Sequence, residues 1–155
     1  MEDRGQGVAG REAPETKDQY PHLLTVPTRW KDNDVYGHVN NVVYYSYFDT
    51  VVNGYLISSG ALDIEESSVI GLVVETQCRY FKPITFPDAV HAGLRVARLG
   101  KSSVRYEIGI FRNDEETAAA QGHFVHVYVD RESRRPTTLP PVMGEALERI
   151  LLREG

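Results

Sequence analysis

Residues 32–41 concentrate polar chemistry beside a strongly apolar segment. They read DNDVYGHVNN and include the carboxylates Asp32 and Asp34, the imidazole of His38 and the adjacent amides Asn40 and Asn41. The segment that follows, residues 42–57, reads VVYYSYFDTVVNGYLI and is rich in aromatic and β-branched side chains. Carboxylates and histidines are the groups that most often transfer protons or activate a nucleophile. The pattern indicates acid–base or nucleophilic chemistry held against a buried element.

That element is predicted to be a helix from Asn40 to about Ile57. Asn40 is a good N-cap, and Val39 before it can pack against Tyr44 as a hydrophobic staple. Apolar side chains cover most of the circumference, which is typical of a buried helix. The exception is a narrow polar stripe formed by Ser46, Asp49 and Asn53.

The rest of the chain reads mainly as strands. One is predicted at His22–Lys31, with Pro27 near an edge or a bulge. Four more follow the helix, joined by short turns such as the two-residue hairpin signal Gly100-Lys101: Val69–Phe81, Ala89–Leu99, Ser102–Arg112 and Thr117–Asp130. Short turns require antiparallel pairing. With a short terminal helix at Val142–Arg153, the order predicts an α+β fold, one five-stranded antiparallel sheet wrapped round one long helix. The exposed sheet edges favour an oligomer.

Composition narrows the class of protein. The chain has 155 residues and a formal charge of −5, which predicts one domain and argues against non-specific nucleic-acid binding. We expect residues 1–21 to be a disordered tail and residues 22–155 to be the domain. No segment resembles a signal peptide or a membrane span, so a cytoplasmic location is expected. The single Cys78 is interpreted as a structural thiol.

The candidate metal and phosphate-binding motifs do not meet the structural requirements of such sites. His123 and His126 lie three residues apart on a predicted strand, so their side chains should point to opposite faces and cannot chelate one ion. The glycines of residues 5–10 match GxGxxG but have no strand before them and no helix after them. No metal site is therefore predicted.

The segment Arg29–Tyr45 resembles the signature of hotdog-fold acyl-CoA thioesterases of the 4-hydroxybenzoyl-CoA thioesterase type, D-x-D-x-x-G-H-V-N-N-x-x-Y. The resemblance extends over residues 22–140 and includes Arg79–Ile84 and Gly100–Ser103. It implies a hotdog fold, an edge-to-edge dimer with two active sites at its interface, and often a tetramer. It also implies an acyl-CoA substrate and no cofactor, with CoA present only as part of the substrate.

The resemblance assigns the catalytic residues. Asp34 matches the acid of the family, as general base or as nucleophile through a mixed anhydride. The backbone N–H of Asn41, at the positive end of the helix, would polarise the thioester carbonyl, and Gly37 would let the loop turn and leave room for the acyl group. His38 could transfer a proton or fix the loop, and Asp32 is expected to be structural, holding the loop through hydrogen bonds from nearby backbone N–H groups. Asp49 could orient water, although hydrogen bonding within the polar stripe is favoured.

The substrate contacts are assigned more broadly. Tyr44 could line the acyl tunnel, although the tyrosines of the helix are mostly expected in the core. Pantetheine would pass along residues 81–84, which include Lys82 and Pro83. The CoA phosphates need cations or N–H groups, and the candidates are Lys82, Lys101, Ser102, Ser103, Arg105, Arg134 and Arg135. A solvated charge run is the simpler interpretation of the arginines at residues 131–135.

Other functions on the same fold remain open. One is a non-catalytic acyl-CoA binding or sensing module, which would bind ligand without turnover. Another is an acyl-carrier-protein thioesterase, which would share the chemistry. A hotdog hydratase is disfavoured because its usual D-x-N-P-x-H pattern differs from the segment that begins at Asp32. The sequence does not define the acyl group.

Overall fold

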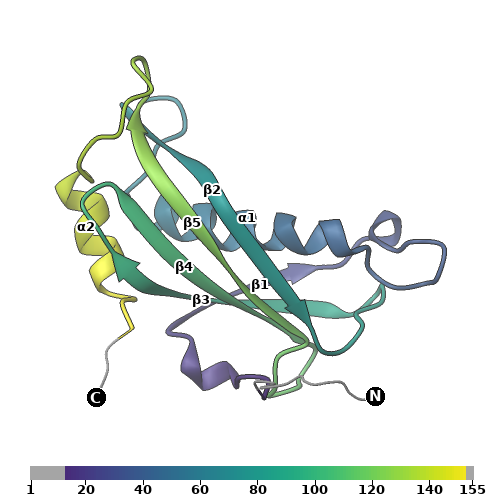
Figure 1. The fold of residues 1–155 in the computed structure, drawn as a ribbon. Coiled ribbons are helices and arrows are strands. Elements are labelled where there is room, and N and C mark those ends of the chain that lie inside the picture. The colour runs from purple at the N-terminus through teal and green to yellow at the C-terminus, as the bar shows by residue number, and fades with distance from the viewer. Residues whose placement is uncertain (1–12, 153–155) are drawn as a thin grey trace.

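A computed structural model describes residues 13–152, and its elements follow the predicted order (Figure 1). They are the 3-10 turns η1 (Lys17–Gln19) and η2 (Trp30–Asp32), the helices α1 (Asn41–Ser58) and α2 (Pro141–Glu148), and the strands β1 (His22–Pro27), β2 (Val69–Tyr80), β3 (Ala89–Leu99), β4 (Ser103–Arg112) and β5 (Ala120–Asp130). The predicted α+β class and the hotdog arrangement are confirmed. No helix within residues 13–152 is long and apolar enough to cross a membrane.

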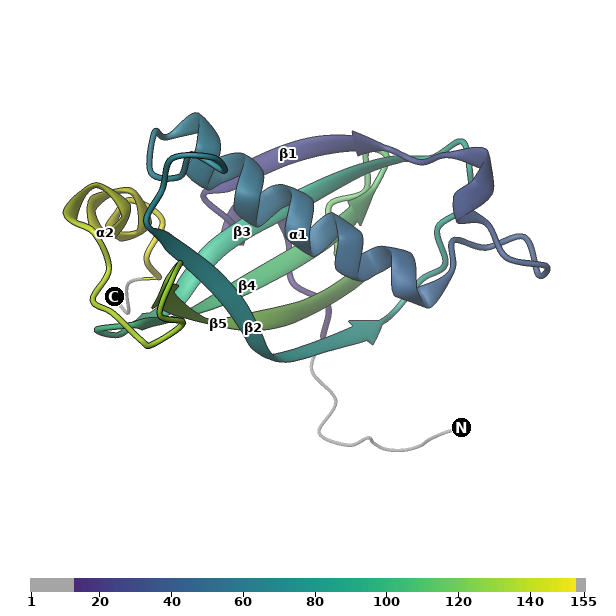
Figure 2. The same cartoon turned by 90° about the horizontal axis from the view of Figure 1, so that it is seen from above.

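The five strands form one antiparallel sheet in the order β1-β3-β4-β5-β2. β2 follows α1 in sequence but lies at the far edge, where β5 is its one strand partner within residues 13–152. Helix α1 lies across one face of the sheet (Figure 2), which we call the inner face; the opposite side is the outer face. The main core fills the space between α1 and the inner face and includes Phe48, Val51, Leu94 and Ile108, all fully buried.

Helix α1 is less enclosed than its composition predicts. Its buried residues lie toward the sheet, but Val42 is 69% exposed and Ser46 and Asp49 also face solvent. A single sheet covers only one side of a helix, so the polar stripe and its apolar neighbours are left open. The predicted polar stripe is therefore open to solvent at Ser46 and Asp49, and Val42 beside it is exposed as well, so α1 is less buried in the single chain than expected.

Several boundaries differ from those predicted. β1 ends at Pro27 rather than Lys31, because the chain turns through η2. β5 begins at Ala120 rather than Thr117, and three residues rather than two connect β3 to β4. Helix α2 ends at Glu148, short of the expected Arg153, which lies outside the described residues.

Residues 15–20, which we call the N-terminal strap, pack against the outer face. Tyr20 is 4% exposed and fills a slot over Gly93 and Gly109, which lie opposite each other on β3 and β4. A Cβ on either glycine would come within 2.8 Å of Tyr20. Residues 1–21 were expected to be a disordered tail. That expectation is corrected for the part that the structure describes, because the buried Tyr20 ring holds this segment against the sheet. Residues 1–12, which include the rejected glycine motif, lie outside the described residues, and the domain boundary at residue 22 stays a prediction.

Candidate active site

The loop between β1 and α1 is anchored by a buried carboxylate. Asp32 is 2% exposed, and its side chain accepts hydrogen bonds from the backbone N, Nε and NH2 of Arg29 at 2.8, 3.0 and 2.8 Å. Its carbonyl oxygen also accepts the backbone N–H of Asn40 at 2.8 Å. Asp32 thus fixes the loop to the start of the helix, as its expected structural role requires.

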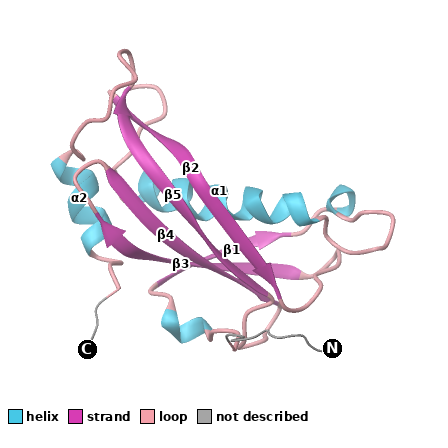
Figure 3. Cartoon of the chain, viewed as in Figure 1, coloured by secondary structure: helices cyan, strands magenta, loops and turns pink. Residues whose placement is uncertain are grey.

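Beyond Asp32 the chain forms a tight hairpin closed by a bridge between Asn33 and Val39. It projects from the sheet as the loop at the right of Figure 3. Gly37 adopts φ +83°, a left-handed conformation that glycine accepts without strain. The backbone N–H of Asp34 donates to the carbonyl of His38 at 2.8 Å. One carboxylate oxygen of Asp34, Oδ1, accepts the amide of Tyr36 at 2.9 Å and approaches that of His38 at 3.5 Å.

Asn40 and Asn41 form the start of α1 as predicted. The side chain of Asn40 accepts the backbone N–H of Val42 at 3.1 Å, which is an N-cap bond. The first residue of a helix has no intrahelical acceptor for its N–H, and the cap bond does not use that of Asn41. This N–H therefore remains at the end of α1 that carries about +0.5 of an elementary charge.

A cleft of about 290 Å³ opens at this end of α1. Its lining comes from the loop, the helix and the end of β2: His38, Val39, Asn41, Tyr44, Tyr80, Phe81, Lys82 and Pro83. Tyr80 donates its hydroxyl to the carbonyl of Asn41 at 3.3 Å, and its ring packs edge-on against Tyr44 with centroids 4.9 Å apart. Burial raises the pKa of the Tyr44 hydroxyl to about 12, so it stays neutral and can only donate or accept hydrogen bonds.

Of the predicted catalytic residues, His38 and Asn41 line this cleft and Asp34 does not. Asp34 lies in the adjoining hairpin, bonded through its backbone to His38. Gly37 lies in the same hairpin and shapes it. The catalytic roles of these four residues stay predictions.

Asp49 lies two helical turns further along α1, outside the cleft. Its side chain is exposed, yet partial desolvation by its surroundings raises the pKa of the carboxyl above its usual value. Its carbonyl accepts the side-chain amide of Asn53 at 2.9 Å, so the two residues are linked within the polar stripe. A role of Asp49 in orienting water stays a prediction.

Three of the predicted substrate contacts meet in the cleft: Tyr44, Lys82 and Pro83. Lys82 is already engaged, since its Nζ lies 2.6 Å from Oε1 of Glu115 and 3.1 Å from the hydroxyl of Thr117. Its ammonium group would have to leave Glu115, or share it, to contact a phosphate. Sequence reasoning missed Tyr80. The available signal was strand alternation. Tyr80 lies two residues after Cys78, the thiol interpreted as structural, so both side chains should lie on the same face of the sheet.

The other predicted phosphate contacts lie far from the cleft. Lys101, Ser102 and Ser103 occupy the turn between β3 and β4 and the start of β4, where Ser103 pairs with Val127. Arg134 and Arg135 follow the end of β5. The cleft lies at the other end of β5, which spans roughly 33 Å at about 3.3 Å per residue. A single chain therefore does not bring these five residues to the thioester.

Cys78 is unsuited to act as a nucleophile. It lies partly buried against the core, and desolvation raises the pKa of its thiol to about 11. At neutral pH it is therefore a thiol rather than the reactive thiolate. This agrees with the structural interpretation.

Comparison with known proteins identifies the class. Residues 28–147 match the thioesterase-like superfamily, and the chain belongs to that superfamily. The structure of the PA5185 protein from Pseudomonas aeruginosa strain PAO1 covers 92% of this chain and 99% of its own, with 50% identity and a TM-score of 0.89. The PA2801 protein of Pseudomonas aeruginosa, described as a candidate thioesterase, is 30% identical over 83% of this chain and 99% of its own, with a TM-score of 0.77.

A more distant structure shares the fold alone. Slr0204, a 1,4-dihydroxy-2-naphthoyl-CoA thioesterase from Synechocystis, is 16% identical over 81% of this chain and 93% of its own, with a TM-score of 0.74. The superfamily match and the PA2801 relative confirm the expected class, a thioester hydrolase, and the distant structure agrees with the hotdog fold.

Proposed function

We propose that the protein hydrolyses acyl-CoA thioesters to a free carboxylate and CoA. The observation that carries the proposal is the opening of the α1 N-terminus into a cleft of about 290 Å³ lined by His38, Asn41 and Tyr80. A carbonyl oxygen placed there can accept the Asn41 N–H, and its developing negative charge is stabilised by the helix end. The apolar and aromatic walls suit an acyl group.

Asp34 is the proposed acid–base or nucleophilic residue. Oδ1 of its carboxylate is bonded to the hairpin, and no bond within residues 13–152 engages Oδ2. As general base, the carboxylate would take a proton from water as the water attacks the carbonyl carbon. As nucleophile, it would form a mixed anhydride, expel the CoA thiolate and be released by water. Both routes need the carboxylate to reach the carbonyl held at Asn41.

We further propose that the active unit is a dimer formed along the free edge of β2. This strand pairs only with β5, and three adjacent apolar side chains on it are 40–60% exposed: Leu72, Val73 and Val74. Unpaired strand edges with apolar side chains are sites of association. A partner docked there would cover the open side of α1 and enlarge the cleft beside Tyr80.

Asp34→Asn tests the chemistry. The amide keeps an oxygen to accept the Tyr36 N–H, so the hairpin is retained, but it cannot act as a base or as a nucleophile. We expect kcat to fall by about 10²–10⁴-fold, with an unchanged circular-dichroism spectrum and Tm. The matched control, Asp114→Asn in the exposed β4–β5 turn, should keep the parent rate. Parent-level hydrolysis by Asp34→Asn would remove Asp34 from the mechanism.

A substrate panel tests the reaction class. Acetyl- to palmitoyl-CoA and aryl-CoA thioesters would be assayed with a free-thiol reagent, each beside the same acyl group on acyl-carrier protein. We expect CoA release from at least one CoA thioester. Saturable binding of acyl-CoA without thiol release would instead show a non-catalytic sensing module. Hydrolysis of the carrier-protein substrates alone would show an acyl-carrier-protein thioesterase.

A further inference from the structure

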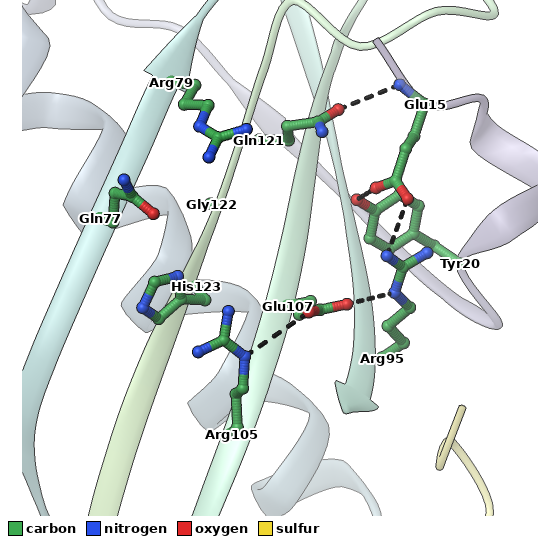
Figure 4. Close-up of a pocket in the computed structure, with 10 residues that line it drawn as sticks. All are labelled: Glu15, Tyr20, Gln77, Arg79, Arg95, Arg105, Glu107, Gln121, Gly122 and His123. Carbon is green, nitrogen blue, oxygen red and sulfur yellow. Dashed lines mark hydrogen bonds and ion pairs between the residues drawn. The ribbon is translucent and has the colours of Figure 1, made fainter. Parts of the chain in front are cut away.

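A second cleft, about 160 Å³ in volume, lies on the outer face of the sheet. It is lined by Glu15, Tyr20, Gln77, Arg79, Arg95, Arg105, Glu107, Gln121, Gly122 and His123 (Figure 4). Apart from Tyr20 and Gly122, each lining residue carries a carboxylate, an amide, an imidazole or a guanidinium. At about 30 Å³ per water molecule, the volume suits a small polar group rather than an acyl chain.

The strand register builds this cleft. One row of side chains crosses the outer face of the sheet, because each member pairs with the next on the neighbouring strand. From β2 through β5 and β4 to β3 the row consists of Gln77, His123, Glu107 and Arg95. The next row ends in Gly109 and Gly93, whose missing side chains leave the slot that Tyr20 fills. The strap therefore forms one wall, and the polar row forms the floor.

The carboxylates that line the cleft are already paired with Arg95 and Tyr20. Arg95 donates from Nε to Glu107 at 2.8 Å and from NH2 to Glu15 at 2.9 Å, and its guanidinium lies 4.6 Å from the centre of the Tyr20 ring. Glu15 also accepts the Tyr20 hydroxyl at 2.6 Å. Neither acid is therefore free to attract a cation, and Arg95 has the structural task of holding the strap.

Arg105 is held less closely than Arg95. Within residues 13–152 its guanidinium makes no hydrogen bond, and it forms two long ion pairs, with Glu107 at 3.6 Å (Figure 4) and with Glu75 at 4.0 Å. Glu75 is itself bonded to Nε2 of His123 at 2.7 Å. In addition, Arg105 lies directly opposite Arg98 on β3, and like charges opposite each other across strands are destabilising. An anion bound to Arg105 would weaken that repulsion, although Arg98 itself is not part of the cleft lining.

We propose that this outer-face cleft binds a small oxyanion of the phosphate class, with Arg105 as its principal donor. The planar guanidinium suits two oxygens of a phosphate at once. Gln121, whose Oε1 already accepts the Glu15 N–H at 3.0 Å, can turn its amide N–H toward the same anion, and His123 forms part of the floor. The inference does not depend on the proposed hydrolysis, because the sheet separates this cleft from the one at Asn41.

Phosphate binding is tested by calorimetric titration of the full chain with inorganic phosphate, at constant ionic strength and pH 7. The parent protein should bind saturably, and Arg105→Gln should bind at least about tenfold more weakly. The Arg105 side chain is 39% exposed and its ion pairs are 3.6 and 4.0 Å long, and exposed ion pairs contribute little to stability, so the variant should keep a Tm near that of the parent. The control Arg149→Gln, exposed near the end of α2, should bind like the parent. Absence of saturable binding in the parent, or equal affinity in Arg105→Gln, would overturn the site.

The source of the phosphate is resolved by two further titrations, with CoA and with dephospho-CoA, which lacks the 3′-phosphate. If Arg105→Gln weakens CoA binding but not dephospho-CoA binding, the site accepts the phosphate of the substrate. If it weakens neither while inorganic phosphate still binds through Arg105, the site accepts a free phosphate. Arg105-independent binding of inorganic phosphate, CoA and dephospho-CoA alike would contradict the proposal.

Discussion

His126 places an ionisable ring inside the core. It is 5% exposed and lies 5.1 Å from the Tyr106 ring and 5.3 Å from the Phe124 ring. Its Nε2 has no hydrogen-bond partner among the residues that the structure describes. Its neighbour His123 faces the other side of the sheet and bonds to Glu75. The sequence predicted these opposite orientations from spacing alone, and the structure confirms them.

This burial predicts a pH dependence of stability. Desolvation lowers the pKa of His126 from 6.5 to about 4, so between these values the unfolded chain binds a proton that the folded chain does not. Stability therefore falls as the pH decreases from about 6.5 toward 4, by about 2–3 kcal/mol from this group. His126→Phe should flatten the slope of unfolding free energy against pH in that window, measured by urea denaturation. An unchanged slope in His126→Phe would contradict the prediction.

Tyr20 and Gly93 should be coupled in stability. A Cβ at position 93 would lie 2.8 Å from Tyr20, so Gly93→Ala should destabilise the parent by about 1–3 kcal/mol through overpacking. Tyr20→Ala removes the ring and should cost about 3–5 kcal/mol. In the double variant the alanine at 93 no longer meets the ring, although the Cβ of residue 20 and the Leu23 side chain stay beside it, so its added cost should be smaller than in the parent. Additive effects in chemical denaturation would show that the slot does not hold Tyr20 in solution.

At the scale of residues, the sequence predicted local roles better than distant ones. Asn40 caps α1 and Asp32 fixes the loop, because both interact with neighbours a few positions away. Lys82 was expected to be free for phosphate, yet it pairs with Glu115. Lys101 lies at the opposite end of the sheet from the cleft. Such distances depend on the tertiary fold, which no local pattern encodes.

At the scale of elements, substitutions of Asn40 at the start of α1 can distinguish an effect on stability from an effect on hydrolysis. Asn40→Ala removes the cap bond to Val42 and should cost about 1 kcal/mol of unfolding free energy. Asn40→Asp retains an acceptor oxygen and places a negative charge where the helix favours it, so stability should be restored. The same charge would repel the oxyanion developing at Asn41, so hydrolysis should still fall in Asn40→Asp. Thermal denaturation and thiol-release kinetics on the three proteins check this, and full activity of Asn40→Asp would argue against an oxyanion site at the helix end.

The existence of α1 and of the strands was predictable from periodicity, and their order in the sheet was not. The predicted strands Val69–Phe81 and Ala89–Leu99 agree with β2 and β3 to within one residue, and short turns required β3, β4 and β5 to be antiparallel neighbours. The placement of β1 beside β3, and of β2 beyond β5, required long-range pairing. The position of Tyr20 on the outer face also depends on Gly93 and Gly109, which lie far away in the sequence.

For the whole molecule, the two sheet edges should differ in association. We expect the parent to be a dimer along β2 and Val74→Lys to be a monomer, because Val74 is 60% exposed and a charge there opposes pairing. Leu23→Lys on β1, where Leu23 is 45% exposed, is the matched control and should stay dimeric. Sedimentation velocity measures the states. Dissociation by Leu23→Lys, with Val74→Lys still dimeric, would move the interface to β1.

The distance in sequence between β2 and its partner has a consequence for synthesis. β2 leaves the ribosome before β3 and β4, but its only strand partner, β5, ends at Asp130. At a translation rate of about 5–20 residues per second, the apolar stretch Leu72–Val74 remains unpaired for roughly 3–10 s before β5 has been synthesised. The nascent chain is therefore most prone to aggregate in that interval, so a chaperone that shields apolar strands should raise the yield of folded protein more than one that acts after release.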